Sequence, residues 1–248
     1  MEVLIDGDIV CFRCAASCEN DDVDLVFYRI NEMMDGILNA TQADSFRVFL
    51  SGKENFRKEV YPEYKAHRSK IPRPRWLEDA REFMETEFKA QVSINEEADD
   101  LLGINQTEDT IICSIDKDLL QVPGKHFNFV KQEFYTITDI SGLKHFYKQC
   151  LMGDRADNIV GIPGIGDKKA DKILLGLETE QEFFNAVREA YSNDEEFIMN
   201  ARCLWIRRKE NEDFRDHFKR LANENEFSES KGQETPADSS GQGSGTLP

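Results

Sequence analysis

Short apolar runs alternate with longer amphipathic stretches along the first half of the chain. The runs are short and mostly apolar, which is typical of buried strands. Residues 74–90 place apolar side chains about 3.6 residues apart, which predicts an amphipathic helix. Strands that alternate with helices predict an α/β fold, with a mostly parallel sheet flanked by helices. The predicted strands are Val3–Ile5, Phe46–Leu50 and Thr110–Ile115.

The second half of the chain has a different pattern. Residues 126–138 predict an extra strand or a hairpin, and from residue 143 onward the periodicity is helical. We expect an α/β core over residues 1–142, a helical region over residues 143–222, and a disordered tail over residues 223–248, which is rich in Gly, Ser, Pro and Glu. The predicted helices of the second region are Leu143–Leu151, Lys168–Leu175, Gln181–Tyr191 and Glu195–Lys209.

The composition is that of a soluble globular protein, since 40% of the 248 residues are hydrophobic and 32% are charged. No run of about 18 apolar residues occurs, so we expect no transmembrane helix and no membrane partner. The first residues, MEVLIDGDIV, lack the basic lead of a signal peptide. Six cysteines without an export signal then favour a reducing, cytoplasmic environment.

The formal net charge of −17 argues against a nucleic-acid partner. Residues 53–75 depart from this average, because they contain eight Lys or Arg against three Glu, a local charge of +5. A strongly basic segment therefore lies inside an acidic chain. The acidic clusters elsewhere are candidates to hold metal ions, which would cancel part of the negative charge.

Carboxylates follow the predicted strands. Asp6 comes directly after the first strand and Asp116 directly after the third, and parallel α/β sheets bind ligands beyond the carboxyl ends of their strands. Converging carboxylates repel one another unless cations lie between them, and such oxygen ligands suit Mg²⁺ or Mn²⁺. Two ions about 4 Å apart are a common arrangement for splitting a phosphodiester. Any single cluster is equally well explained as a turn or a helix cap. The clusters are Asp6 with Asp8, Glu97 with Asp99 and Asp100, Asp116 with Asp118, and Asp154 with Asp157.

A Gly-rich turn, GIPGIG, lies between two predicted helices. Glycine lets the backbone approach a phosphate closely, and the N–H groups that open the next helix point at it. Lys168 and Lys169 stand at that helix start, where a positive charge is unfavourable unless an anion is bound. The pattern predicts a helix–hairpin–helix over residues 154–175 that grips a duplex backbone, with a plain helix–helix turn as the alternative. Its glycines are Gly161, Gly164 and Gly166.

Within the basic segment, Pro62 can begin a short helix and Pro72 would end it. Tyr64, Lys65 and Arg68 would share one face of that helix. Aromatic rings between cations suit single-stranded nucleic acid, because bases stack on the rings while the cations hold phosphates. A solvated charged loop is the alternative.

Four motifs, YPEYKAHR, EADD, SIDKDLLQ and GDRADNIVGIPGIGDKKA, occur in this order. Together they resemble the 5′-nuclease domain of bacterial DNA polymerase I and the phage 5′–3′ exonucleases and flap endonucleases, over residues 1–210. The resemblance implies a PIN-like core, two Mg²⁺ ions for which Mn²⁺ can substitute, and hydrolysis of DNA or RNA from the 5′ end. It also implies cleavage of 5′ flaps and removal of RNA primers in replication or repair.

Carried over to the matching positions, the resemblance implies a role for each residue. Asp6 and Asp116 would be catalytic, and Lys65 and Arg68 would contact the scissile phosphate from a helical arch over residues 53–75. The implied metal ligands are Asp6, Glu97, Asp99, Asp100, Asp116, Asp118, Asp154 and Asp157, with Asp8 adjacent. The residues implied to bind DNA are Tyr64, Lys65, Arg68, Gly161, Gly164, Gly166, Lys168 and Lys169.

The resemblance also implies partners and a setting. The expected partners are DNA with 5′ ends, flaps or nicks, and an RNA–DNA hybrid stays open as a further substrate. No polymerase motif follows, so a stand-alone, monomeric nuclease is expected, in the cytoplasm of a bacterium or of a phage-infected host.

One position departs from the family pattern. The family usually has an Asp at the end of the second strand, where this chain has Ser51 or Gly52. Three outcomes stay open: the other carboxylates suffice, Glu54 or Asp8 substitutes, or one metal is held more weakly.

Two other functions compete with the nuclease. LIDGDIV resembles the signature of haloacid-dehalogenase-type phosphatases, with Asp6 as nucleophile and Asp8 as acid. That reading leaves YPEYKAHR, EADD and the Gly-rich hairpin unexplained. A non-catalytic DNA-binding protein would keep the hairpin and the arch, but the retained carboxylates argue against it.

Overall fold

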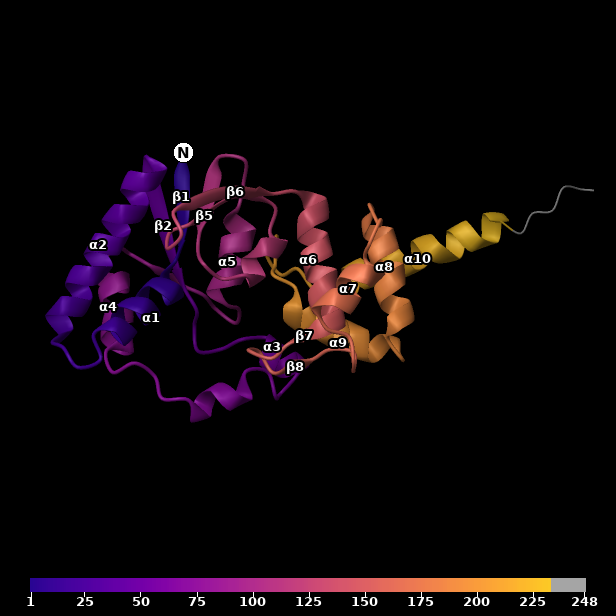
Figure 1. The fold of residues 1–248 in the computed structure, drawn as a ribbon, viewed down its shortest axis with the longest axis horizontal. Helices are drawn as coiled ribbons and strands as arrows, with labels where there is room; N and C mark the ends of the chain where they lie inside the picture. The colour runs from indigo at the N-terminus through magenta and orange to yellow at the C-terminus, as the bar shows by residue number, and fades with distance from the viewer. Residues whose placement is uncertain (233–248) are drawn as a thin grey trace, which may run out of the picture.

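A six-stranded sheet forms the centre of the N-terminal half in the computed structural model, which describes residues 1–232 (Figure 1). The strands are β1 (Glu2–Asp6), β2 (Ser45–Leu50), β3 (Gln91–Val92), β4 (Thr110–Cys113), β5 (Gly124–Asn128) and β6 (Glu133–Ile137). Their order in the sheet is β3-β2-β1-β4-β5-β6, and every neighbouring pair is parallel except β5 with β6. The predicted mostly parallel α/β sheet is confirmed, and residues 126–137 fall within the antiparallel β5–β6 hairpin.

Helices cover both faces of this sheet. The helices of the N-terminal half are α1 (Gly7–Ser17), α2 (Val23–Thr41), α3 (Arg57–Val60), α4 (Leu77–Glu87) and α5 (Ala98–Asn105). Val3 and Ile5 of β1 point into an apolar cluster with α1, α2 and α4. Leu4 points to the other face, where it packs in a cluster with α5. Ile206, far along the chain, belongs to this second cluster, so the C-terminal half contributes to the core of the sheet.

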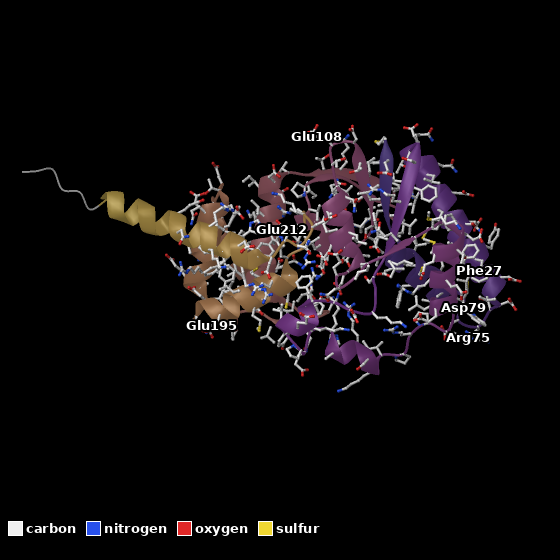
Figure 2. The ribbon with its side chains drawn as sticks, turned by 180° about the vertical axis from the view of Figure 1, so that it is seen from behind. Phe27, Arg75, Asp79, Glu108, Glu195 and Glu212 are labelled. Atoms are coloured by element: carbon white, nitrogen blue, oxygen red, sulfur yellow. The ribbon has the colours of Figure 1, made fainter. Side chains whose placement is uncertain are left out.

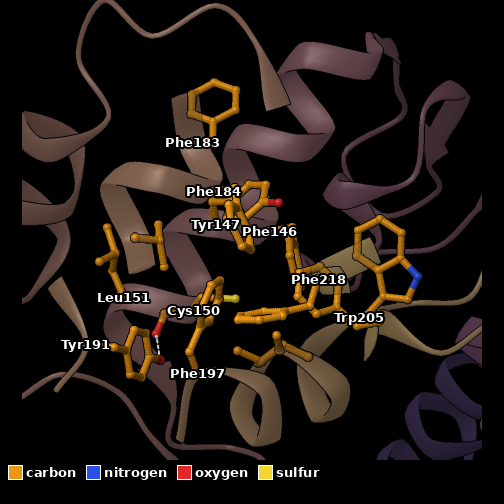
Figure 3. Close-up of a cluster of buried hydrophobic side chains, with 14 of the residues drawn as sticks. Phe146, Tyr147, Cys150, Leu151, Phe183, Phe184, Tyr191, Phe197, Trp205 and Phe218 are labelled. Atoms are coloured by element: carbon orange, nitrogen blue, oxygen red, sulfur yellow. Dashed lines mark hydrogen bonds between the residues drawn. The ribbon is translucent and has the colours of Figure 1, made fainter. Parts of the chain in front are cut away.

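The C-terminal half is helical and is built on one aromatic cluster (Figure 3). Its elements are α6 (Asp139–Met152), β7 (Gly153–Asp154), β8 (Ile159–Val160), α7 (Asp167–Ile173), α8 (Glu180–Ala190), α9 (Asp194–Leu204) and α10 (Phe214–Gly232). Phe146 of α6, Phe184 of α8 and Phe197 of α9 are fully buried in this cluster. Tyr191 donates a hydrogen bond of 2.5 Å to the carbonyl of Cys150, which ties the end of α8 to α6. These contacts hold the short β7–β8 hairpin at the end of a packed helix.

Two boundaries differ from the sequence prediction. Helix α9 ends at Leu204 rather than at Lys209, because the buried side chain of Gln121 donates to the Leu204 carbonyl and accepts from the amide of Ile206. These bonds hold the chain extended where a helix was predicted. Helix α10 includes residues 223–232, where the sequence predicted disorder, and residues 233–248 lie outside the described residues. Within residues 1–232, every helix is too short or too polar to cross a lipid bilayer.

Residues 61–76, which we call the arch segment, cross from α3 to α4 past the β7–β8 hairpin (Figure 1). The predicted helix from Pro62 to Pro72 is wrong: the segment has turns and one 3₁₀ helix, Ala66–Lys70. Its far end is fixed to the loop between α1 and α2, because Trp76 donates to the carbonyl of Asp21. Arg75, labelled in Figure 2, lies 4.0 Å over the Trp76 ring. The arch segment is therefore attached at both ends to the sheet's helices.

Candidate active site

Asp6 stands at the carboxyl end of β1, in the centre of the sheet. Its carboxylate caps α1 by accepting the Ile9 amide at 3.1 Å, and it accepts the hydroxyl of Ser114 at 2.6 Å. Burial, together with the nearby charges of Asp8 and Asp116, raises the pKa of Asp6 to about 7. A neighbouring cation strongly stabilises the charged form of such a buried carboxylate.

Asp99 and Asp116 lie in the same electrostatic environment. Asp99, in the first turn of α5, has its pKa raised well above the usual range by burial and by the charges of Asp6 and Asp116. Asp116 follows β4, and its carboxylate accepts the amide of Asp118 at 2.9 Å. The charge of Asp116, which follows β4, therefore acts on both Asp6 of β1 and Asp99 of α5.

A second group of carboxylates extends this site toward the β7–β8 hairpin. Burial and the charges of Asp116 and Asp154 raise the pKa of Asp118 to about 7. Burial acts to raise the pKa of Asp154 as well, but the ammonium of Lys117, 2.9 Å away, holds it below its usual range. Glu97, Asp99, Asp118 and Asp157 line one common pocket, together with Tyr64, Arg57 and others. The structure thus brings seven of the predicted ligands to one end of the sheet, and Lys117, which the prediction did not include, lies among them.

The arch segment meets these carboxylates directly. Lys65 donates to Glu97 at 2.6 Å and lies 3.5 Å from Asp157, and its amide donates to the Asp157 carbonyl. Arg68 donates to the Asp157 carboxylate at 2.8 Å. Both predicted cations are therefore at the acidic site, and Arg68 keeps about half of its side chain exposed.

Tyr64 does not have the predicted role of a stacking platform for bases. Its side chain is only 2% exposed, and its hydroxyl is 2.8 Å from the Asp157 carboxylate and 3.0 Å from that of Glu97. Burial and the charge of Glu97 raise its pKa well above the usual range, so it stays a neutral donor. Tyr64 orients the two carboxylates from within the core.

Asp100 also departs from its predicted role as a metal ligand. Its carboxylate is fully buried and accepts both terminal nitrogens of Arg57, at 2.6 and 2.8 Å. It also accepts the backbone amides of Glu97 and Arg207. Four hydrogen bonds occupy its two oxygens, and Arg57 in turn donates to the carbonyls of Cys203 and Trp205. Asp100 is therefore an anchor for the fold. The sequence carried no local signal for this partner, because Arg57 lies 43 residues away.

At the end of β2, where the expected Asp is absent, Ser51 and Asp8 form a hydrogen-bonded group. The Ser51 amide donates to Asp8 at 2.9 Å, and Arg81 of α4 donates to the other oxygen of Asp8. The Ser51 hydroxyl accepts the amide of Ala98, which opens α5. Glu54, the other residue expected to replace the missing Asp, is exposed and lies outside this group.

The Gly-rich turn follows β8 and leads into α7. A Cβ at Gly161 would lie 2.2 Å from the backbone nitrogen of Gly153, so glycine is needed for the close packing of the hairpin. Gly164 has a positive φ of 79° and is exposed, as are Gly166 and the lysines that open α7. The turn thus presents bare backbone and two cations, Lys168 and Lys169, to solvent.

The donor set of this site fits a hard divalent cation, because all its candidate ligands are carboxylate oxygens, and burial with nearby like charges raises the pKa of Asp6, Asp99 and Asp118. Within residues 1–232, no three carboxylate, imidazole or thiolate groups are already arranged around one point as a metal site. Lys65, Arg68 and Lys117 instead hold the carboxylates of Glu97, Asp157 and Asp154.

The fold and this site define a resolvase-like nuclease. The model of the 5′-3′ exonuclease N-terminal resolvase-like domain matches residues 2–148, which is more than half of the chain. The chain therefore belongs to the 5′-3′ exonuclease family.

Among curated proteins, the chain is 26% identical over 215 residues to a 5′-3′ exonuclease of Buchnera aphidicola subsp. Schizaphis graminum, covering 77% of this chain and 75% of the relative. It is 33% identical over 189 residues to DNA polymerase I of Borreliella burgdorferi, a match that covers 66% of this chain but 19% of the polymerase.

Among solved structures, the chain is similar to the T5 5′-exonuclease with bound zinc ions, with a TM-score of 0.64 and 21% identity over 82% of this chain and 89% of that one. It is also similar to the flap endonuclease of bacteriophage T5 in a complex with DNA and metal ions, with a TM-score of 0.58 and 19% identity over 90% of this chain and 98% of that one. At these identities the likeness concerns the fold.

Proposed function

We propose that this protein is a metal-dependent 5′-3′ exonuclease and structure-specific 5′-flap endonuclease that hydrolyses phosphodiester bonds in DNA. One observation carries the proposal: carboxylates from β1, α5, β4 and β7 converge where the cations Lys65 and Arg68 of the arch segment meet them. This combination serves a reaction at a phosphate, because the carboxylates bind metal and the cations bind the anion.

Each residue has a proposed task. Asp6, Asp99 and Asp116 would hold one divalent ion, Asp118, Asp154 and Asp157 would hold a second, and Glu97 would be a further ligand. Two bound Mg²⁺ ions, or Mn²⁺ in their place, supply activation of the attacking water and stabilisation of the leaving oxygen. Lys65 and Arg68 bind and orient the scissile phosphate. Tyr64 holds Glu97 and Asp157 in place through its hydroxyl.

We propose that the Gly-rich turn holds the duplex part of the substrate. Gly164 and Gly166 let the backbone come close to a phosphate, and Lys168 and Lys169 add charge. Such contacts recognise a backbone and not a sequence, so the substrate is selected by its structure. On this division, residues 1–142 carry most of the chemistry and residues 143–222 carry the helix–hairpin–helix-type grip. DNA with 5′ ends, flaps or nicks is the proposed substrate, with RNA primers on DNA as a further one, in replication or repair in the cytoplasm of a bacterium or phage-infected host.

Cleavage of a 5′-labelled flap DNA by the full chain tests the proposal. We expect Mg²⁺-dependent products, none in EDTA, and none from Asp116→Asn, which should still bind DNA. Asp139→Asn, an exposed carboxylate on α6, is the matched control and should cut normally. Release of inorganic phosphate instead of oligonucleotides would indicate a phosphatase, and a shift of uncut DNA would indicate a binding protein. Normal turnover in EDTA would refute the metal-dependent mechanism.

A further inference from the structure

The arch segment is flanked by two arginines, and each is bonded to the catalytic end of the sheet. Arg57 precedes the arch segment in α3 and forms the buried pair with Asp100 of α5. Arg81 follows it in α4 and donates to Asp8 and, at 2.5 Å, to the carbonyl of Ser51. The two arginines therefore join both ends of the arch segment to the region that holds the carboxylates.

Arg81 of α4 contacts one residue in α1 and one residue at the end of β2. Asp8 comes from the first turn of α1, two residues after Asp6, and Ser51 follows directly after β2. The Ser51 amide also donates to Asp8, at 2.9 Å, so the three residues form a closed ring of hydrogen bonds. The side chains of Arg81 and Asp8 are 20% and 29% exposed, which shields the pair from much of the solvent. The guanidinium of Arg81 thus fixes the side chain of Asp8 and the peptide group of Ser51.

Ser51 links this ring of hydrogen bonds to the start of α5. Its hydroxyl accepts the amide of Ala98 at 2.9 Å, one of the N–H groups at a helix start that need an outside partner. The next residue, Gly52, donates its amide to the hydroxyl of Ser93 at 2.9 Å, in the loop that leads to α5. The start of α5 is therefore held in place by the end of β2, and Asp99 lies in the first turn of this helix.

We propose that Arg81 is a positioning residue of the nuclease centre: through Asp8 and Ser51 it sets the place of the first turn of α5, and with it the carboxylates of Glu97 and Asp99. The inference rests on the proposed function, since it takes these carboxylates as ligands of the reaction's metal ions. Arg81 acts through other residues and does not bind the phosphate, unlike Lys65 and Arg68. Arg81 should therefore contribute to the rate of cleavage in the enzyme–DNA complex and not to the affinity for DNA.

The first test separates these two contributions by steady-state and single-turnover cleavage of flap DNA. Arg81→Met should lower kcat about 10- to 100-fold, because small misplacements of catalytic groups have effects of this size, while KM for DNA stays within about twofold. Arg81→Lys keeps the charge but reaches fewer acceptors, so it should recover only part of kcat. An unchanged kcat, full recovery by Lys, or a rise confined to KM would overturn the proposal.

Arg47→Met is the matched control. Arg47 also forms a partly exposed ion pair, at 2.8 Å with Glu2, and also donates to Asn105 at the end of α5. Glu2 is at the amino end of β1, opposite to Asp6 at its carboxyl end, and Arg47 pairs with Leu4 in the middle of this strand. This variant should lose stability without a change in kcat. A loss of kcat equal to that of Arg81→Met would show that any broken ion pair has this effect, and the proposal would fail.

The second test does not need activity. Amide hydrogen exchange of the full chain without DNA, read at Ala98 and Asp99, should be at least roughly tenfold faster in Arg81→Met than in the parent. Ser51→Ala should have the same effect and Arg47→Met should not. Unchanged exchange in Arg81→Met would overturn the proposal even if its cleavage were slow. A parent that binds but does not cut DNA would overturn the proposed function instead, and the exchange result would still decide whether Arg81 positions α5.

Discussion

The replacement of Asp100 by Asn separates an anchor of the fold from a metal ligand. Asp100 accepts four hydrogen bonds, two of them from Arg57, whose side chain is 2% exposed. Asn has nearly the same shape, so no cavity forms. Its amide group, however, presents donors to a guanidinium that has only donors, and it leaves the charge of Arg57 buried without a partner.

The size of the effect follows from these contacts. Removal of one partner of a buried ion pair costs about 3–5 kcal/mol, because the remaining charge stays desolvated. Two lost hydrogen bonds to a charged group, at about 1.5–3 kcal/mol each, lead to a similar value. For a chain of this length we expect a fall in Tm of roughly 6–20 °C.

The pH dependence has a definite sign. Burial acts to raise the pKa of Asp100, but the charge and hydrogen bonds of Arg57 outweigh it and lower that pKa. The pair therefore stabilises the fold above the pKa of the unfolded carboxyl, and this contribution is lost as the pH falls through the folded pKa. The difference in stability between parent and Asp100→Asn should be full at pH 7 and should shrink in acid.

Urea unfolding at pH 7 and in acid, with EDTA present, measures this difference. Asp99→Asn is the matched comparison on the neighbouring residue, and it should leave stability unchanged or raise it, because burial and like charges already oppose the charged form of Asp99. Titration of both variants with Mn²⁺ completes the experiment. If Asp100→Asn keeps the parent's stability and loses Mn²⁺ affinity, Asp100 is a ligand and the anchor role is refuted.

Three further outcomes are expected. Lys65→Ala and Arg68→Ala should each lower single-turnover cleavage about 10²-fold with little change in duplex affinity, and parent rates in both would remove them from the chemistry. Because the pKa values of Asp6 and Asp118 are raised to about 7, the folded state holds protons that the unfolded state has lost, so thermal stability in EDTA should fall as the pH rises from about 4 to about 7, and a flat profile would contradict this. Gly164→Val, at a φ of 79°, should weaken binding to all DNA sequences alike and reduce its salt dependence, whereas a sequence-selective loss would count against a backbone grip.

The elements that the sequence predicted well are those whose pattern is local. Short, mostly apolar runs identified β1, β2 and β4, because strands in the centre of a sheet have few polar positions. Asp6 and Asp116 could be placed together for the same reason, since the ends of neighbouring parallel strands meet at one edge of the sheet.

The elements that it predicted poorly depend on distant partners. Lys65 was expected in a helix, yet it has a positive φ of 54°. Its amide donates to the Asp157 carbonyl and its ammonium pairs with Glu97, and these two contacts fix this backbone conformation. Asp99 and Asp100 are neighbours in the same motif, but only the contact of Asp100 with Arg57 assigns them different roles. Neither contact leaves a trace in the local pattern of the chain.

The buried position of Arg57 has a consequence for the synthesis of the protein. Its guanidinium needs the carbonyls of Cys203 and Trp205 as well as Asp100, and Ile206 completes the apolar cluster beneath α5. In a nascent chain that has emerged only to residue 142, Arg57 therefore lacks two of its acceptors, the carbonyls of Cys203 and Trp205. At about 5–20 residues per second, a ribosome needs on the order of 3–13 s more to reach residue 206. Throughout that interval the apolar cluster beneath α5 lacks Ile206 and Arg57 lacks two of its acceptors, so we expect the nuclease centre to mature only when most of the chain has been made.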